Sequence, residues 1–92
     1  FQPVSRDFAF IVDEKLEAEK LVRAVASADK KLIDAVEIFD VYAGKGVETG
    51  KKSVAVAVTL QPVEKTLTDE EISATGTKII DAVKNIGGVL RA

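Results

Sequence analysis

The chain has 92 residues, of which 47% are hydrophobic and 30% charged, and its formal net charge is −2. This composition is typical of one globular domain, which at this length has no room for a deep substrate cleft beside its core. The acidic balance argues against a strongly basic nucleic-acid binder, and the absence of cysteine and histidine excludes disulfides, thiolate metal sites and a histidine base. No apolar run reaches the roughly 18 residues of a membrane span. We predict a single domain over residues 1–92, and a start at Phe1 rather than Met indicates a piece of a longer protein.

The first two thirds of the chain show three strands and a helix. Residues 6–13 (RDFAFIVD) alternate between bulky and smaller side chains, which is the period of a strand. Residues 13–29 then place apolar residues at helical spacing, with Asp13 as the expected N-cap. Residues 31–42 (KLIDAVEIFDVY) and 53–62 (SVAVAVTLQP) are rich in β-branched residues and predict a second and a third strand.

A second helix has the clearest start signal in the sequence. In LTDEEI, Thr68 at the N-cap and Glu71 three residues later predict a capping box, in which each side chain satisfies the other residue's free backbone N–H. Gly76 is expected to let this helix approach the sheet closely, and Gly87 and Gly88 to form a left-handed C-cap. The expected apolar stripe of the helix is Ile72, Ile79, Ile80, Val83 and Ile86.

The elements follow the order strand, helix, strand, strand, helix, strand, with residues 89–92 (VLRA) as the last strand. This order predicts an α+β, ferredoxin-like βαββαβ fold, in which a four-stranded antiparallel sheet carries both helices on one face. The other face, here called the open face, is left uncovered. The third strand separates the two faces, because Val54, Val56 and Val58 share one side and must face the core.

The second strand decides which polar residues reach the open face. Phe39 and Val41 fit the core, which puts Asp40 and Tyr42 on the open face. The same alternation would also expose the apolar residues upstream of Phe39, so we expect either a β-bulge in this strand or a contact with a neighbouring domain. The open face is thus predicted to gather Asp40, Tyr42, Ser53, Ala55 and Arg91, bordered in the hairpin loop by Lys45, Lys51 and Lys52.

These residue types could bind RNA. A tyrosine ring stacks on a base, a carboxylate accepts a hydrogen bond from a base amino group, and arginine or lysine meets phosphate. Each type also has an ordinary interpretation, as a half-buried strand aromatic, a solvated edge charge or a solubilising hairpin charge. Spacing alone therefore leaves both a ligand-binding face and a plain surface open.

The glycines of the hairpin do not form a phosphate-binding loop. Such a loop requires G-x-x-x-x-G-K-[ST] between a strand and a helix. Here Gly44 and Gly50 are one residue too far apart, Lys52 intervenes before Ser53, and a strand follows. The glycines instead predict a long hairpin in which they take positive φ.

Four stretches in combination resemble one known family: RDFAFIVD, FDVYAGKGVETGKKSVAV, KTLTDEEI and GGVLR. They are similar to the ferredoxin-fold anticodon-binding domain, which forms the C-terminal end of the bacterial phenylalanyl-tRNA synthetase beta subunit. The resemblance runs from about Pro3 to Arg91, nearly end to end.

The resemblance implies roles for individual residues. Tyr42 matches the tyrosine that stacks on an anticodon base, while Asp40 and Ser53 match positions that contact base edges. Arg91 matches the terminal arginine near the anticodon. Lys45 departs from the family pattern, which often has an acidic residue there.

The resemblance also implies a parent enzyme, a cytoplasmic heterotetramer of alpha and beta chains that joins phenylalanine to its tRNA using ATP and magnesium. The implied partners are phenylalanine tRNA, through its anticodon stem-loop, the alpha subunit and the remaining beta-subunit domains. Since the aminoacylation site of that enzyme lies in the alpha subunit, the resemblance implies no catalytic residue, metal or cofactor in this domain.

Other proteins of this topology fit less well. A small-molecule regulatory domain of the amino-acid-sensing kind would have a glycine-rich turn after the first strand, where this chain has DEKLEAE. An acylphosphatase-like enzyme would need an arginine-bearing phosphate loop there, and a standard RRM would need aromatic residues on the third strand. A ferredoxin-like regulatory or protein-interaction domain stays the alternative to RNA binding.

Overall fold

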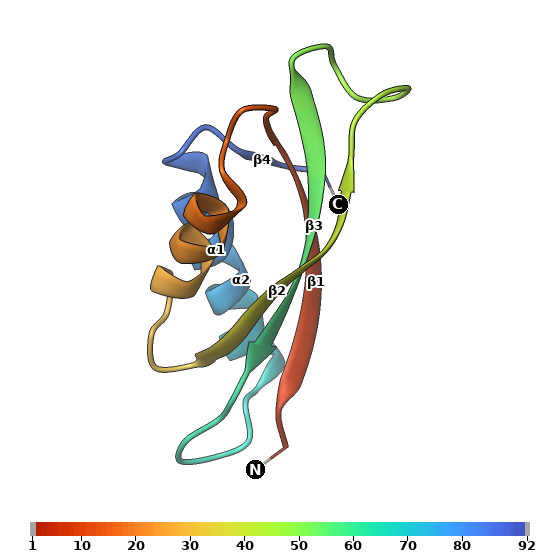
Figure 1. Ribbon diagram of the computed structural model, residues 1–92. Coiled ribbons are helices and arrows are strands. Elements are labelled where there is room, and N and C mark those ends of the chain that lie inside the picture. The colour runs from red at the N-terminus through yellow and green to blue at the C-terminus, as the bar shows by residue number, and fades with distance from the viewer. Residues whose placement is uncertain (1, 92) are drawn as a thin grey trace.

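The computed structural model describes residues 2–91 and contains the expected elements in the expected order. Both helices lie on the same side of one sheet (Figure 1), which confirms the α+β, ferredoxin-like fold. Within residues 2–91, no helix is long and apolar enough to cross a membrane. The elements are β1 (Val4–Asp13), α1 (Ala18–Ser27), β2 (Ile33–Tyr42), β3 (Lys51–Leu60), α2 (Asp69–Lys84) and β4 (Val89–Leu90).

The sheet has the strand order β2-β3-β1-β4, and every neighbouring pair is antiparallel. β1 and β3 form its centre and pair over their full length of 10 residues. The β2–β3 hairpin extends past the helices at the top of Figure 1, and the domain is elongated, with extents of 44 × 20 × 19 Å. The open face is therefore a long surface made mainly by β1, β2 and β3.

The core lies between the sheet and the helices. The predicted alternation of β3 is confirmed, because Val54, Val56 and Val58 are at most 2% exposed. In β1, Phe10 is fully buried, and its ring stacks on Phe8 with the ring centroids 5.8 Å apart. The buried apolar residues that pack on these strands from the helices are Leu21 and Val25 in α1 and Ile79 and Val83 in α2.

A β-bulge in β2 confirms one expectation and overturns another. Ile38 pairs with Val56 on the core side, but Asp40 pairs with the very next residue of β3, so β2 uses one residue more than β3 between the two pairs. The phase of the alternation changes at the bulge, and Ile38 packs against the core. The prediction that Phe39 and Val41 are core residues is wrong for both, because each is 55% exposed. Phe39 lies at the bulge, whereas Val41 keeps the core side opposite Val54 but lies in the part of the hairpin that extends past the helices (Figure 1).

Helix α1 begins later than the sequence indicated. Its N-cap is Glu17, whose backbone is extended at φ −69° and ψ 136°. Asp13, the expected N-cap, instead ends β1, and its Oδ1 accepts a hydrogen bond from the Lys15 N–H at 2.8 Å. Asp13 therefore stabilises the turn that follows β1, which is a common role of aspartate, and the prediction that it caps the helix is wrong.

The predicted capping box at the start of α2 is confirmed. Thr68 Oγ1 accepts a hydrogen bond from the Glu71 N–H at 3.1 Å, and Glu71 Oε1 accepts one from the Thr68 N–H at 3.0 Å. The hydrogen bond from the Thr68 backbone is the main cause that holds the pKa of the Glu71 carboxyl below its usual value of 4.5. The Lys65 ammonium, with its Nζ 3.7 Å from Glu71 Oε1, lowers that pKa further.

The capping box should make the stability of the domain depend on pH. The pKa of Glu71 is lower in the folded than in the unfolded chain. The ionised carboxylate therefore contributes to the free energy of unfolding above about pH 4.5, and this contribution is lost as the pH falls through the lowered folded pKa. Glu71→Gln keeps an acceptor at this position but does not titrate. The midpoints of chemical denaturation of wild type and Glu71→Gln should therefore converge on acidification, and a gap that stays constant down to pH about 3 would contradict this expectation.

The close approach of backbone to core occurs at Gly88. The helix ends before Ile86, which is 38% exposed, so its predicted place in the buried stripe is wrong. Gly87 takes the left-handed φ of +87° expected of a C-cap, whereas Gly88 is buried and donates its N–H to Val83 O at 2.9 Å. A Cβ on Gly88 would overlap Val83 Cγ1 and lie 3.0 Å from Val12 Cγ1.

Gly76, predicted to permit a close approach, has room for a methyl group. A Cβ there would lie 3.8 Å from Cζ of the Phe8 ring, an ordinary van der Waals distance. Close helix packing therefore does not require glycine at this position.

Candidate nucleic-acid interface

The register of the strands arranges the open face in rows that cross the sheet. Directly paired residues of antiparallel strands share a face, so each row can be read from strand to strand. The row nearest the hairpin consists of Val89, Ile11, Ser53 and Tyr42. The second row consists of Arg91, Ala9, Ala55 and Asp40. The third row consists of Asp7, Ala57 and Glu37.

The second row brings predicted site residues from three different strands or their ends together. Arg91 follows β4, and its N–H donates to Ala9 O at 2.6 Å, which continues the ladder past the last residue of the strand. Asp40 and Ala55 are direct partners. Tyr42 and Ser53 pair in the neighbouring row, so these five predicted residues form one contiguous area.

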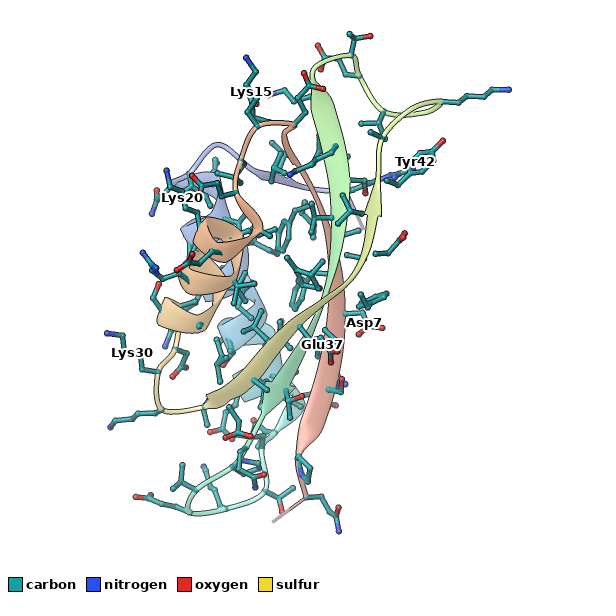
Figure 2. The ribbon with its side chains drawn as sticks, viewed as in Figure 1. Asp7, Lys15, Lys20, Lys30, Glu37 and Tyr42 are labelled. Carbon is teal, nitrogen blue, oxygen red and sulfur yellow. The ribbon has the colours of Figure 1, made fainter. Side chains whose placement is uncertain are left out.

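Tyr42 is held by the hairpin that follows it. Its hydroxyl donates a hydrogen bond to Lys45 O at 2.5 Å, and a Cβ on Gly44 would lie 3.8 Å from Tyr42 Oη. The side chain is 41% exposed and projects away from the helices (Figure 2). Gly44, Gly46 and Gly50 take positive φ, as predicted for the hairpin. A ring fixed at one end and exposed on its surface is suited to stacking, which needs no hydroxyl.

Ser53 belongs to the open face by register but is only 6% exposed. Its direct neighbours in the row are Tyr42 and Ile11, and both have larger side chains than serine. The Ser53 hydroxyl therefore lies below the larger side chains of Tyr42 and Ile11. Ser53 and the half-buried Ala55 form a low part of the open face and do not project from it.

The three predicted lysines separate in the structure. Lys45 is exposed in the hairpin loop, but Lys51 and Lys52 lie in β3, so the prediction that they belong to the loop is wrong. Lys51 pairs with Asp13 and shares the side of Ser53. Lys52 lies on the opposite side, where its Nζ donates to Leu16 O at 2.8 Å and ties β3 to the connection between β1 and α1.

Two exposed carboxylates on the open face were not singled out from the sequence. Asp7 and Glu37 are the ends of the third row, one row from Asp40, and Asp7 projects from the side of the sheet that faces away from the helices (Figure 2). The two cations lie away from these carboxylates, with Arg91 at the β4 edge and Lys51 at the hairpin end of β3. The signal for Asp7 was present in the alternation of residues 6–13, whereas Glu37 required knowledge of the bulge.

The charge distribution favours a particular kind of ligand. A carboxylate accepts hydrogen bonds from base amino and imino groups but repels phosphate. The arrangement therefore suits bases turned toward the sheet, with their backbone along the cationic border.

Within residues 2–91, no cluster of three or more acidic, histidine or cysteine side chains could hold a metal ion. A shallow hollow of about 870 Å³ lies between the helices and is lined by Lys20, Arg23 and Lys30 among others, away from the open face.

Residues 1–91 match the family described as "Ferredoxin-fold anticodon binding domain". The chain belongs to this family. Among curated proteins it is 60% identical to the phenylalanine–tRNA ligase beta subunit of Bradyrhizobium diazoefficiens and 59% identical to that of Rhodopseudomonas palustris. The beta subunit of Nitrobacter winogradskyi is 54% identical. The alignments cover 99–100% of this chain, which spans only 11–12% of the length of these relatives.

Proposed function

We propose that the chain is the anticodon-recognition module of a phenylalanine–tRNA ligase and that it binds the anticodon stem-loop of phenylalanine tRNA on the open face. One observation carries the proposal: the strand register gathers Tyr42, Asp40 and Arg91 on the face that the helices leave uncovered. Membership in an anticodon-binding family supports the same ligand.

Each residue has a role that follows from its chemistry and place. Tyr42 stacks on one anticodon base, and Asp40, in the adjoining row, accepts a hydrogen bond from a base edge. Ser53 and Ala55 form the low floor that lets a flat base approach the sheet. Arg91 and, at the hairpin, Lys45 and Lys51 attract the phosphates. Lys52 has no such role, because its ammonium is bound to Leu16 O.

The parent enzyme proposed here is the cytoplasmic ligase of alpha and beta subunits, which uses ATP and magnesium to join phenylalanine to its tRNA. In that enzyme this module is non-catalytic. It contributes binding energy far from the reacting atoms, and such remote binding energy can raise the rate of the chemical step by fixing the position of the tRNA.

An NMR titration of the chain with an anticodon stem-loop tests the proposal. Amide shifts should concentrate in β1, β2, β3 and around Arg91, while those of α1 and α2 stay in place. Low salt is required, because a module of net charge −2 gains little from counterion release. A stem-loop with the same stem and a scrambled anticodon is the control. Shifts centred on the helices, or equal binding of both RNAs, would contradict the proposal.

The lysine pair of β3 provides matched variants for the same titration. Lys51→Ala should weaken binding of the cognate and the scrambled RNA alike and flatten the dependence of affinity on salt, because it removes a phosphate contact. Lys52→Ala changes the same charge at the neighbouring residue on the other side of the sheet. It should leave the salt dependence unchanged, and equal effects of the two variants would show that only bulk charge matters.

A further inference from the structure

Phe39 is an exposed aromatic residue for which the proposed function has so far given no role. It is 55% exposed, whereas Phe8 and Phe10 stack on each other at the core. The bulge explains the exposure. Ile38 packs against the core, so the following side chain of the extended strand points to the other side, and Asp40 then takes its place on the open face. The bulge thus gives the open face two consecutive side chains of β2.

The surroundings of Phe39 leave room for a flat ligand. The β3 residues opposite this part of β2 are Ala57 and Ala55, both half-buried and small. The residues on either side of Phe39 along the open face are the exposed carboxylates Glu37 and Asp40. A planar group stacked on the ring would therefore have hydrogen-bond acceptors at its edges.

These acceptors distinguish a nucleobase from an apolar protein surface. A protein segment that covered Phe39 by apolar contact would also bury the Glu37 and Asp40 carboxylates, which is costly unless each gains a partner. A base carries its own donors in the plane of the ring and presents an apolar surface above and below it. One ligand of this kind can cover the ring and satisfy a neighbouring carboxylate together.

We propose that Phe39 is a second base-stacking residue, so that the open face holds two unpaired bases, one on Tyr42 and one on Phe39, with Asp40 between them. This inference rests on the proposed function. Phe39 and Tyr42 are three residues apart on one strand, about 10 Å of extended chain, which is too far for a single base to cover both rings. Every RNA base carries an amino or imino N–H on its Watson–Crick edge, so the flanking carboxylates select an unpaired base that turns this edge toward them.

Fluorescence of 2-aminopurine, which stacking quenches, tests the inference. Three stem-loops carry the probe at successive anticodon positions, and each is titrated with wild type, Phe39→Ala, Phe39→Leu and Tyr42→Ala. Wild type should quench two positions. Phe39→Ala should restore the fluorescence of one of them and weaken binding about tenfold, whereas Tyr42→Ala should restore the other. Phe39→Leu keeps apolar bulk without a ring, and stacking predicts that it behaves like Phe39→Ala.

Val41→Ala is the matched control, because Val41 is also 55% exposed on β2 but pairs with the buried Val54 on the core side. It should change neither fluorescence nor affinity. Three results would overturn the inference while the proposed function stands. Phe39→Leu could bind and quench like wild type, or Phe39→Ala could bind as tightly as wild type. The third is that Phe39→Ala and Tyr42→Ala restore the fluorescence of the same anticodon position. A wild-type chain that neither binds nor quenches any of the three RNAs would overturn both.

Discussion

In the proposed parent ligase, Tyr42→Ala is expected to lower kcat/KM for the tRNA by about ten- to hundredfold while phenylalanine activation stays nearly unchanged. Loss of a stacked base costs about 1–3 kcal/mol, and this converts to the stated factor. The activation step of such a ligase involves only the amino acid and ATP, so a residue whose proposed role is to contact tRNA should not affect it. Aminoacylation kinetics, measured beside ATP–pyrophosphate exchange on the same preparation, separate the two steps.

Tyr42→Phe is the control for this expectation. It keeps the ring and loses only the hydrogen bond to Lys45 O, so most of the tRNA affinity should remain, with a modest loss if the hairpin holds the ring less firmly. Wild-type kinetics of Tyr42→Ala, or impaired phenylalanine activation, would show that Tyr42 serves packing alone. A loss in Tyr42→Phe as large as in Tyr42→Ala would assign the effect to the hairpin and not to stacking.

Gly88→Ala is expected to destabilise the domain by about 1–3 kcal/mol, because the added methyl would overlap Val83 Cγ1 and press on Val12 Cγ1. Both valines are core residues at most 1% exposed, so they have little space into which to move. The backbone O of Val83 lies 3.3 Å from the same position and accepts a hydrogen bond from the Gly88 N–H. Gly88 therefore cannot move away from Val83 without stretching the hydrogen bond that ends the helix. The free energy of unfolding in urea measures the effect.

Gly76→Ala is the matched substitution, and we expect it to change the free energy of unfolding in the opposite direction. It adds the same methyl inside α2, at ordinary contact distance from the Phe8 ring, and replaces glycine by the best helix former. We expect it to stabilise the domain by up to about 1 kcal/mol. A Gly88→Ala variant as stable as wild type would mean that the helix end moves freely away from the sheet.

Prediction from the sequence succeeded for the strand at the centre of the sheet and for contacts between residues close together in the chain. β3 lies in the middle of the sheet with both neighbours paired, and its Val54, Val56 and Val58 alternate without interruption, so the core side could be assigned correctly. The capping box of α2 depends on residues three positions apart, which a sequence shows directly. The fold class followed from these two signals and the order of the elements.

The wrong or missed assignments on the sheet share a physical cause, which is the pairing between strands. A bulge changes the phase of a strand without changing its composition, so nothing in the letters of residues 36–42 shows which apolar residue faces the core. Phe39 was therefore assigned to the wrong face. The burial of Ser53 depends on Tyr42 across the hairpin, and the place of Lys52 on its contact with Leu16. Such properties arise between strands, and alternation along a single strand cannot supply them.

The acidic centre of the open face has a consequence for competition among RNAs. Asp7, Glu37 and Asp40 repel any phosphate backbone that lies directly across them, and the module as a whole, at a net charge of −2, has no excess of positive charge to hold RNA without regard to sequence. In a cell where other RNAs far outnumber one tRNA, a proposed reader of this kind would spend little time occupied by the wrong molecule. Its selectivity would come from rejecting RNAs whose bases are paired or misplaced and so cannot present their N–H groups to the carboxylates, and the same weak binding would let the charged tRNA leave quickly.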